Sequence, residues 1–221
     1  MKAMILAAGL GTRLRPLTDD RPKALVTVAG RTLLEIALER LHIFGVNEVI
    51  VNVHHFGDMI VEYLKASGNF GMRIEVSRED VLLDTGGGLK KAAPFFLDSS
   101  ANPHEPFIVH NVDVISTIDL GRMVRFHREQ NALATLAVQD RETSRYLLFA
   151  GDGLLCGRQA GRDGKSELVR PTQHFRSLAF CGIHVLSPRI FAGIEGEGAF
   201  SIITTYLHLA ARAERIVAFR A

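Results

Sequence analysis

The sequence predicts an α/β fold of three layers, in which helices cover both faces of a mostly parallel β-sheet. The chain has 221 residues, a length at which one α/β domain can bury a full core. Short apolar runs alternate with amphipathic segments along its first half. These runs resemble strands that are buried on both faces of a sheet. We therefore expect residues 1–221 to form a single domain.

In the first half of the chain, predicted strands and helices follow one another regularly. The strands are predicted at residues 3–8, 46–53 and 72–77, and the helices at residues 32–44 and 58–66. In the first helix, Leu33, Ala37 and Leu41 recur with a helical period. Gly45 then ends that helix.

The second half continues the alternation but contains one different segment. We predict strands at residues 107–114, 134–138, 177–185 and 215–219, a helix at residues 120–130 capped by Asp119, and a last helix from the cap Ser201 to about residue 213. Between them, Gly151-Asp152-Gly153 separates short strands near residues 147–149 and 154–156, which is the pattern of a hairpin. We expect a lid or insertion at about residues 140–175 rather than a second domain.

Composition and charge exclude several classes of protein. The net charge is only +2, without a long basic run, and argues neither for nor against nucleic acid. We expect no nucleic-acid partner. Two cysteines without a C-x-x-C motif suggest neither a disulfide framework nor a zinc site. No apolar run is long enough to span a membrane, and Met1-Lys2 leads directly into a strand. We expect a cytoplasmic protein without a membrane partner, and the sequence leaves a homo-oligomer open.

A loop with two glycines follows the first strand and reads Ala8-Gly9-Leu10-Gly11-Thr12-Arg13. Gly9 and Gly11 allow the backbone to turn sharply and to approach a ligand closely. Successive amide groups in such a turn form an anion-binding nest. Arg13, Arg15 and Lys23 add positive charge suited to phosphate groups. The loop therefore predicts a polyphosphate site at the carboxyl end of a buried strand.

Other interpretations of this loop fit less well. A dinucleotide-binding loop would have glycine or alanine in place of Leu14, which argues against a nicotinamide-dependent oxidoreductase. A Walker A loop would need Gly-Lys-Ser/Thr where Leu14-Arg15-Pro16 stands. An ordinary turn with surface arginines is the plainest alternative, but it leaves the coincidence of two glycines and three cations unexplained.

Later strand ends carry further candidate ligand groups. Asp113, preceded by Asn111, ends a buried strand and is well placed for Mg²⁺, although an N-cap role is the alternative. Asn52 ends an earlier strand on the same side of the sheet. In Asp84-Thr85-Gly86-Gly87-Gly88, before a short helix at residues 89–93, the glycines suit either a flexible loop or close approach to a flat base. His110 is more typical of a buried core histidine than of a ligand.

With these motifs the sequence resembles the sugar-1-phosphate nucleotidyltransferases, especially their uridylyl- and mannose-1-phosphate guanylyl-transferring branches. The resemblance rests on Leu6-Ala7-Ala8-Gly9-x-Gly11-Thr12-Arg13-Leu14, followed by Pro22-Lys23, and covers most of the chain. It implies a Rossmann-like mixed sheet of the nucleotide-diphospho-sugar transferase type. It also implies an enzyme that joins a nucleoside triphosphate, with UTP or GTP favoured, to a sugar-1-phosphate, using Mg²⁺ and releasing pyrophosphate.

The resemblance assigns roles to residues of the matching motifs. Arg13 would bind the leaving pyrophosphate, Lys23 would bridge the α-phosphate and the sugar phosphate, and Asp113 would hold Mg²⁺. The candidate substrate-binding residues are Ala8, Gly9, Gly11, Thr12, Asn52, Thr85, Gly86, Gly87, Asn111 and Gly182. In the family, a Thr-Gly-Gly segment holds the base and a strand with the glycine corresponding to Gly182 lies along the sugar. A packing role is nearly as good an interpretation of Gly182.

The sequence departs from the family pattern at several positions. Val112 precedes Asp113 where the family usually has glycine, and Glu197 is a doubtful substitute for a sugar-binding glutamate. The family's second metal-binding aspartate would follow the last strand, beyond Ala221. Either the chain continues past that residue or Mg²⁺ is held with half its usual protein ligands. This departure motivates one alternative, a module that senses nucleotides or sugar nucleotides without turnover.

Overall fold

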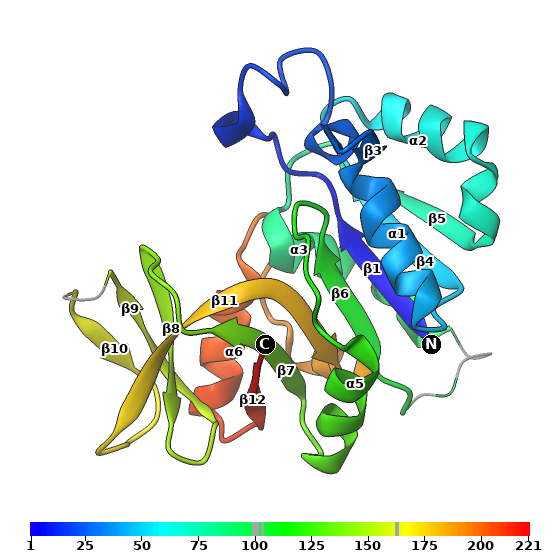
Figure 1. Cartoon of the computed structure of the whole chain (residues 1–221). Helices are drawn as coiled ribbons and strands as arrows, with labels where there is room; N and C mark the ends of the chain where they lie inside the picture. Colours follow the sequence, from blue (N-terminus) through cyan, green and yellow to red (C-terminus); the bar gives the residue numbers. More distant parts are fainter. Residues whose placement is uncertain (99–101, 103, 162–163) are drawn as a thin grey trace.

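A ten-stranded β-sheet forms the centre of the computed structural model, which describes residues 1–98, 102, 104–161 and 164–221. Helices cover both faces of this sheet, so the predicted three-layer α/β fold is confirmed (Figure 1). A separate ribbon of β2 (Thr27–Val28) and β3 (Arg31–Thr32) pairs on its own.

The main part of the sheet is parallel, with one strand reversed. Its parallel strands are β1 (Lys2–Leu6), β4 (Glu48–Val53), β5 (Arg73–Arg78), β6 (Phe107–Asn111), β7 (Ala134–Gln139) and β12 (Ile216–Arg220). The reversed strand β11 (Phe175–Leu186) lies between β6 and β7. Leu6 of β1 is in register with Asn52 of β4 and Asn111 of β6. The ends of these three strands therefore form one row at the carboxyl edge of the sheet.

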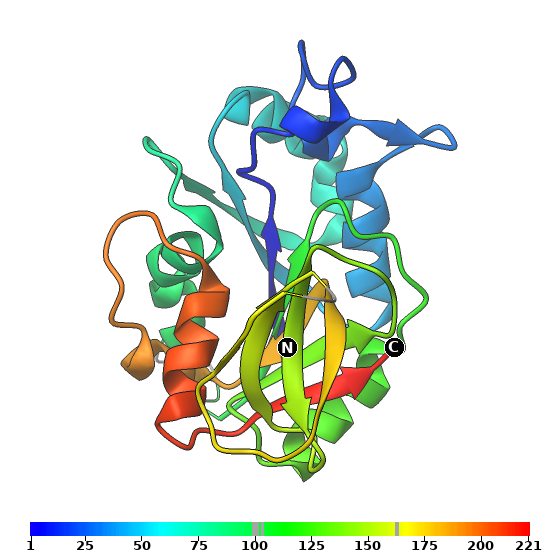
Figure 2. The ribbon, with the colours of Figure 1, turned by 90° about the vertical axis from the view of Figure 1, so that its left-hand side faces the viewer.

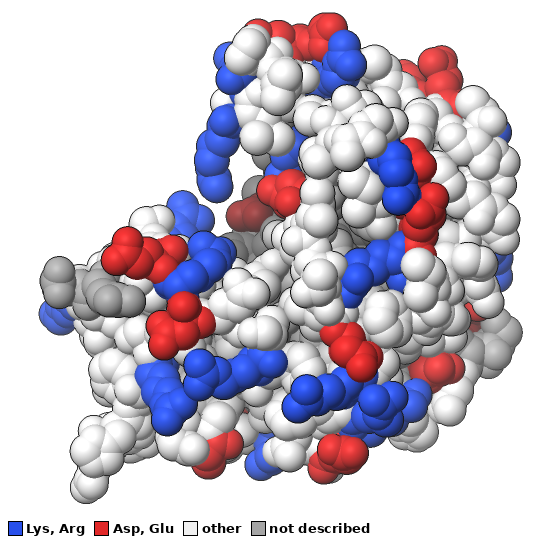
Figure 3. Space-filling model, in the orientation of Figure 1, with Lys and Arg blue, Asp and Glu red and all other residues white. Residues whose placement is uncertain are grey.

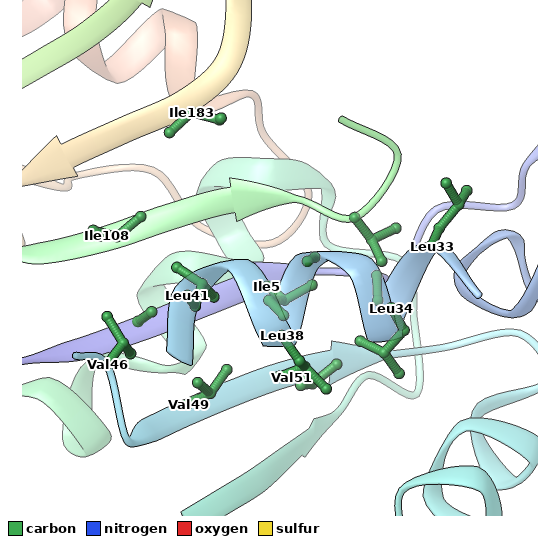
Figure 4. Close-up of a cluster of buried hydrophobic side chains, with 14 of the residues drawn as sticks. Ile5, Leu33, Leu34, Leu38, Leu41, Val46, Val49, Val51, Ile108 and Ile183 are labelled. Atoms are coloured by element: carbon green, nitrogen blue, oxygen red, sulfur yellow. The ribbon is translucent and has the colours of Figure 1, made fainter. Parts of the chain in front are cut away.

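Each face of the sheet has its own hydrophobic core, because successive side chains of a strand point to opposite faces. Ala3 and Ile5 of β1 contribute to the first core, and Met4 contributes to the second. The first core is closed by α1 (Leu33–Ile43), α2 (Gly57–Ala66) and α5 (Leu120–Glu129). The second is closed by α3 (Asp84–Lys91), α4 (Ala93–Leu97) and α6 (Ile202–Ala211). Figure 4 shows the stripe of Leu34, Leu38 and Leu41 on α1 against the strands.

A small antiparallel extension continues from the amino-terminal half of β11. There, β11 pairs with β8 (Arg145–Ala150), followed by β9 (Leu155–Ala160) and β10 (Ser166–Leu168). These strands project from the main body in Figure 1 and face the viewer in Figure 2. The predicted hairpin of β8 and β9 is confirmed, whereas β10 was not predicted. The function of this segment as a lid stays a prediction.

The predicted helix caps are also confirmed. The side chain of Asp119 accepts a hydrogen bond from the backbone of Arg122, and Ser201 accepts one from Ile203. The last helix ends at Ala211, two residues earlier than predicted, and the 3₁₀ helix Pro188–Gly193 was not predicted. In the described part of the chain, no helix is long and apolar enough to cross a membrane.

Three histidines are buried: His110 on β6, His184 on β11 and His127 on α5. Burial lowers the pKa of His110 to about 4, which agrees with its predicted place in the core. Burial also lowers the pKa of His127 to about 4 and that of His184 to about 3. The ring of His127 contacts the hydroxyl groups of Thr135 and Ser187, both at 2.9 Å. These contacts suit a neutral ring with one donor and one acceptor nitrogen.

We expect acidification to destabilise the fold, in part through His127. The folded state keeps this ring neutral down to about pH 4, whereas the unfolded chain protonates it near pH 6.5. The unfolded state thus binds the extra proton between these values, so stability falls as the pH is lowered through this window. A His127→Gln variant should show a slope of unfolding free energy against pH that is smaller by about 1 kcal/mol per pH unit. Urea titrations of both proteins between pH 5 and 6 measure this, and equal slopes would contradict it.

Candidate active site

A cavity of about 700 Å³ opens at the carboxyl edge of the parallel strands. Its walls come from the segments that follow β1, β5 and β6, from the ends of β4 and β6, and from Ala199. Figure 3 shows the molecule hollowed between the first loop and the β8–β10 extension, with charges of both signs nearby. The sequence-predicted residues that line the cavity are Ala8, Gly9, Gly11, Thr12, Arg13, Lys23, Asn52, Thr85, Asn111 and Asp113. The structure thus brings together residues that lie far apart along the chain.

Gly11 shapes the loop after β1. Its backbone has a φ of +67°, and an added Cβ would lie 2.9 Å from the Cγ2 atom of Thr18. The Thr18 hydroxyl donates a 2.9 Å hydrogen bond to the Gly11 carbonyl and is itself buried. Glycine is therefore required here by both conformation and space. At Gly9, no atom of the described residues lies within 4 Å of the Cβ position, so the space beside this glycine is open.

Two cations approach the cavity near this loop. The Lys23 ammonium lies 2.6 Å from Oδ2 of Asp113, and their side chains are 21% and 42% exposed. Lys23 begins a short 3₁₀ helix after Pro22, and Asp113 follows β6, so the pair joins distant segments. Within the described ranges, Arg13 has no carboxylate at ion-pair distance. The Lys23 ammonium is thus paired with Asp113, the predicted metal ligand. The Arg13 guanidinium is available to bind an anion.

Asn52 and Glu79 form a buried hydrogen-bonded pair at the cavity wall. Asn52 accepts a bond from the Ala7 backbone amide, and its Nδ2 atom donates to Oε1 of Glu79, both at 2.7 Å. Both ends of the Asn52 amide are therefore engaged by protein groups. Sequence reasoning missed Glu79, although it follows β5 as Asp113 follows β6. An acid just beyond the carboxyl end of a predicted strand was the signal that could have found it.

The glycine cluster after β5 differs from its prediction. We expected a loop, but Asp84 to Lys91 form the helix α3, and its three glycines are buried. An added Cβ would lie 2.4 Å from the Phe200 ring at Gly86 and 2.3 Å from the Gly198 carbonyl at Gly87. The backbone of Gly86 also donates to the Phe200 carbonyl at 2.9 Å. These glycines let the helix pack against residues 198–200, while Asp84 and Thr85 face the cavity.

A Gly86→Ala substitution should destabilise the protein by about 1–3 kcal/mol, because overpacking forces neighbouring groups apart. The added methyl group would collide with both the ring and the carbonyl of Phe200. Gly151→Ala is the matched control, since no atom in the described part of the chain lies within 4 Å of that Cβ position. Chemical unfolding of both variants measures the difference. Equal stabilities would show that the helix can move away without cost.

Gly182 lies at an irregularity of β11, where the register shifts between Phe180 and His184. Its φ is +76°, and an added Cβ would lie 2.7 Å from Nδ2 of Asn111 and 3.0 Å from Cγ2 of Val114. Unlike Asn111, it is not part of the cavity wall. This geometry favours the packing interpretation of Gly182, and its contact with a sugar stays a prediction.

Few side chains at the cavity could bind a metal ion. In the residues that the structure describes, no group of three or more His, Cys, Asp or Glu side chains is arranged to hold an ion. Asp113 contributes one half-exposed carboxylate to the cavity. A single carboxylate suits Mg²⁺, which commonly keeps several waters and binds substrate phosphate oxygens.

These features define an α/β protein with a ligand cavity at the carboxyl edge of a parallel sheet, beside a glycine-containing loop. The nucleotidyl transferase family model matches residues 2–149. A relative named N-acetylmuramate alpha-1-phosphate uridylyltransferase, from Caulobacter vibrioides, is 35% identical over 95% of this chain and 84% of its own length. The chain belongs to the nucleotidyl transferase family.

Two further comparisons agree with this assignment. Probable mannose-1-phosphate guanylyltransferase 3 from Oryza sativa is 32% identical over 88% of this chain. The chain spans about half of that relative, 52% of its length. The crystal structure of HddC from Yersinia pseudotuberculosis complexed with GMP-PN has a TM-score of 0.76 and 21% sequence identity. That comparison covers 100% of this chain and 90% of HddC, and it supports the fold alone.

Proposed function

We propose that this protein joins a nucleoside triphosphate to a sugar-1-phosphate and releases pyrophosphate. The observation that carries the proposal is the approach of Lys23 to Asp113, 2.6 Å apart, beside the glycine loop in one cavity. A cation and a metal-competent carboxylate are thereby available where the phosphates of both substrates would meet. The family membership supports the same reaction class.

In this proposal the protein acts by positioning phosphates and neutralising their charge. The phosphate of a sugar-1-phosphate is already ionised near neutral pH, because its second pKa is about 6. It can attack the α-phosphorus of the nucleotide in line without a general base. Arg13, Thr12 and the amides of Gly9–Gly11 would bind the leaving pyrophosphate. Lys23 would contact both the α-phosphate and the incoming sugar phosphate.

We assign a divalent cation, Mg²⁺, to Asp113. The exposed carboxylate at the end of β6 fits an ion that takes most of its other ligands from water and phosphate. The ion would supply charge neutralisation between the phosphate groups. Lys23 would leave Asp113 and turn to the phosphates when the carboxylate binds the cation.

UTP and GTP are the nucleotides favoured by this proposal, because the named relatives are uridylyl- and guanylyltransferases. Thr85, at the start of α3, would contact the base, with Gly86 and Gly87 shaping the wall behind it. Ala8, Asn111 and Asn52 complete the proposed binding surface. The predicted cytoplasmic location and any homo-oligomer stay predictions.

A matrix of four nucleoside triphosphates against several sugar-1-phosphates, each with Mg²⁺, tests the proposal. We expect pyrophosphate release only when a matching pair of substrates is present. Tight nucleotide binding without pyrophosphate release in any pair, at any Mg²⁺ concentration, would favour the sensing module instead. Absence of both binding and release would reject the proposed site.

A further inference from the structure

Glu79 is a carboxylate buried at the cavity wall, and the proposed reaction gives it no role. Only 4% of the residue is exposed. Its Oε1 atom accepts the 2.7 Å hydrogen bond from Nδ2 of Asn52, and its Oε2 atom accepts a 3.0 Å bond from the backbone amide of Leu83. Burying a carboxylate is costly, and these two hydrogen bonds offset part of that cost. The presence of a carboxylate at this buried position therefore requires an explanation beyond packing.

The directions of these bonds follow from the two backbone amides at the ends of the chain of contacts. The amide of Ala7 can only donate, so the oxygen of the Asn52 side chain must face it. The Asn52 nitrogen therefore faces Glu79. The amide of Leu83 also can only donate, so Glu79 meets donors on both of its oxygens. With an amide at position 52, the residue at position 79 must therefore accept on both of its oxygens, as a carboxylate does.

This chain of contacts joins two walls of the cavity. Ala7 immediately precedes the glycine loop, and Leu83 precedes Asp84 and Thr85 at the start of α3. Gly88 packs against the link, since an added Cβ would lie 2.8 Å from both Nδ2 of Asn52 and Oε1 of Glu79. The pair thus has little freedom to rearrange, and the two walls are fixed relative to each other.

We propose that Glu79 is a positioning residue that acts through Asn52. It fixes the position of the glycine loop relative to the start of α3. The glycine loop would bind the phosphates, and the start of α3 would bind the base. This inference rests on the proposed function, because it assumes that one nucleotide spans both walls. It requires that a change at residue 79 weakens the binding of a ligand that has no base.

The test uses pyrophosphate with Mg²⁺ as the probe and calorimetry of the whole chain as the readout. Glu79→Gln places an amide nitrogen against one of the two donors, and Asn52→Asp places a carboxylate against Glu79. Each single variant should bind pyrophosphate about ten-fold more weakly, the effect of one buried unsatisfied group.

The exchange variant, which carries both Asn52→Asp and Glu79→Gln, has the same net charge as the wild type. In it, the carboxylate introduced at position 52 can accept hydrogen bonds from the Ala7 amide and from the side-chain nitrogen introduced at position 79. The side-chain oxygen at position 79 can still accept from the Leu83 amide. Every donor of the original chain of contacts therefore keeps an acceptor.

We expect the exchange variant to recover most of the wild-type affinity for pyrophosphate. Unchanged affinity in the single variants would overturn the inference, as would an exchange variant no better than either of them. If the exchange variant does not fold, as judged by thermal unfolding, Glu79→Ala and Asn52→Ala replace it. Their losses should then combine to less than the product of the separate factors, and a full product would overturn the inference. Pyrophosphate binding without turnover in the wild type would reject the proposed function and leave this test valid.

Discussion

Replacing Lys23 with alanine is expected to lower the rate of pyrophosphate release by a factor of about 10²–10³, the usual cost of losing one charge-stabilising contact. The Lys23 side chain is only 21% exposed, and its ammonium group lies 2.6 Å from Asp113 inside the cavity. No bulky apolar group is removed, so the fold should stay intact. Steady-state kinetics with the best substrate pair from the matrix measure the effect.

Arg21→Ala is the matched control for this variant. Arg21 lies two residues earlier in the same segment, carries the same charge and pairs with the exposed Asp20 rather than with Asp113. We expect its activity to stay close to that of the wild type. A Lys23→Ala enzyme that is as active as this control would remove Lys23 from the proposed mechanism.

Replacing Asp113 with alanine is expected to abolish most activity by a similar factor, about 10²–10³. The change removes the carboxylate that we assign to the cation and leaves Lys23 without its partner. Raising the Mg²⁺ concentration should restore part of the activity, because the nucleotide phosphates can still bind the ion. Kinetics as a function of Mg²⁺ measure both effects.

Asp58→Asn serves as the control for Asp113. Asp58 is 83% exposed and pairs with Arg78 at the start of α2, away from the lining of the cavity. Its Mg²⁺ dependence should match that of the wild type. An Asp113→Ala variant with the same Mg²⁺ dependence as this control would contradict the metal assignment.

Local patterns were sufficient to predict most of the fold. Apolar runs identified most of the parallel strands, although β5 alternates polar and apolar residues, and the caps Asp119 and Ser201 set the starts of α5 and α6. The sequence also predicted the row of polar side chains at the carboxyl edge of the sheet. Parallel strands end at the same edge, and Asn52 and Asn111 lie at the ends of their strands.

Features that depend on tertiary contacts were not predictable. Glycines are poor helix formers, so local helix propensity did not predict that α3 begins at Asp84. Its position depends on Phe200, which lies far along the chain. The pairing of Lys23 with Asp113 likewise joins segments 90 residues apart. Glu79 follows a predicted strand and could have been noted for that, but its hydrogen bonds to Asn52 and Leu83 are visible only in the structure.

The most direct test of the account is a crystal structure of the protein with a non-hydrolysable UTP analogue and Mg²⁺. The β- and γ-phosphates should lie over the amides of Gly9–Gly11, within hydrogen-bonding distance of Arg13. The cation should contact Asp113, and Lys23 should have moved from that carboxylate to the α-phosphate. Phosphates bound anywhere else on the protein, with Lys23 still paired to Asp113, would contradict the central claim.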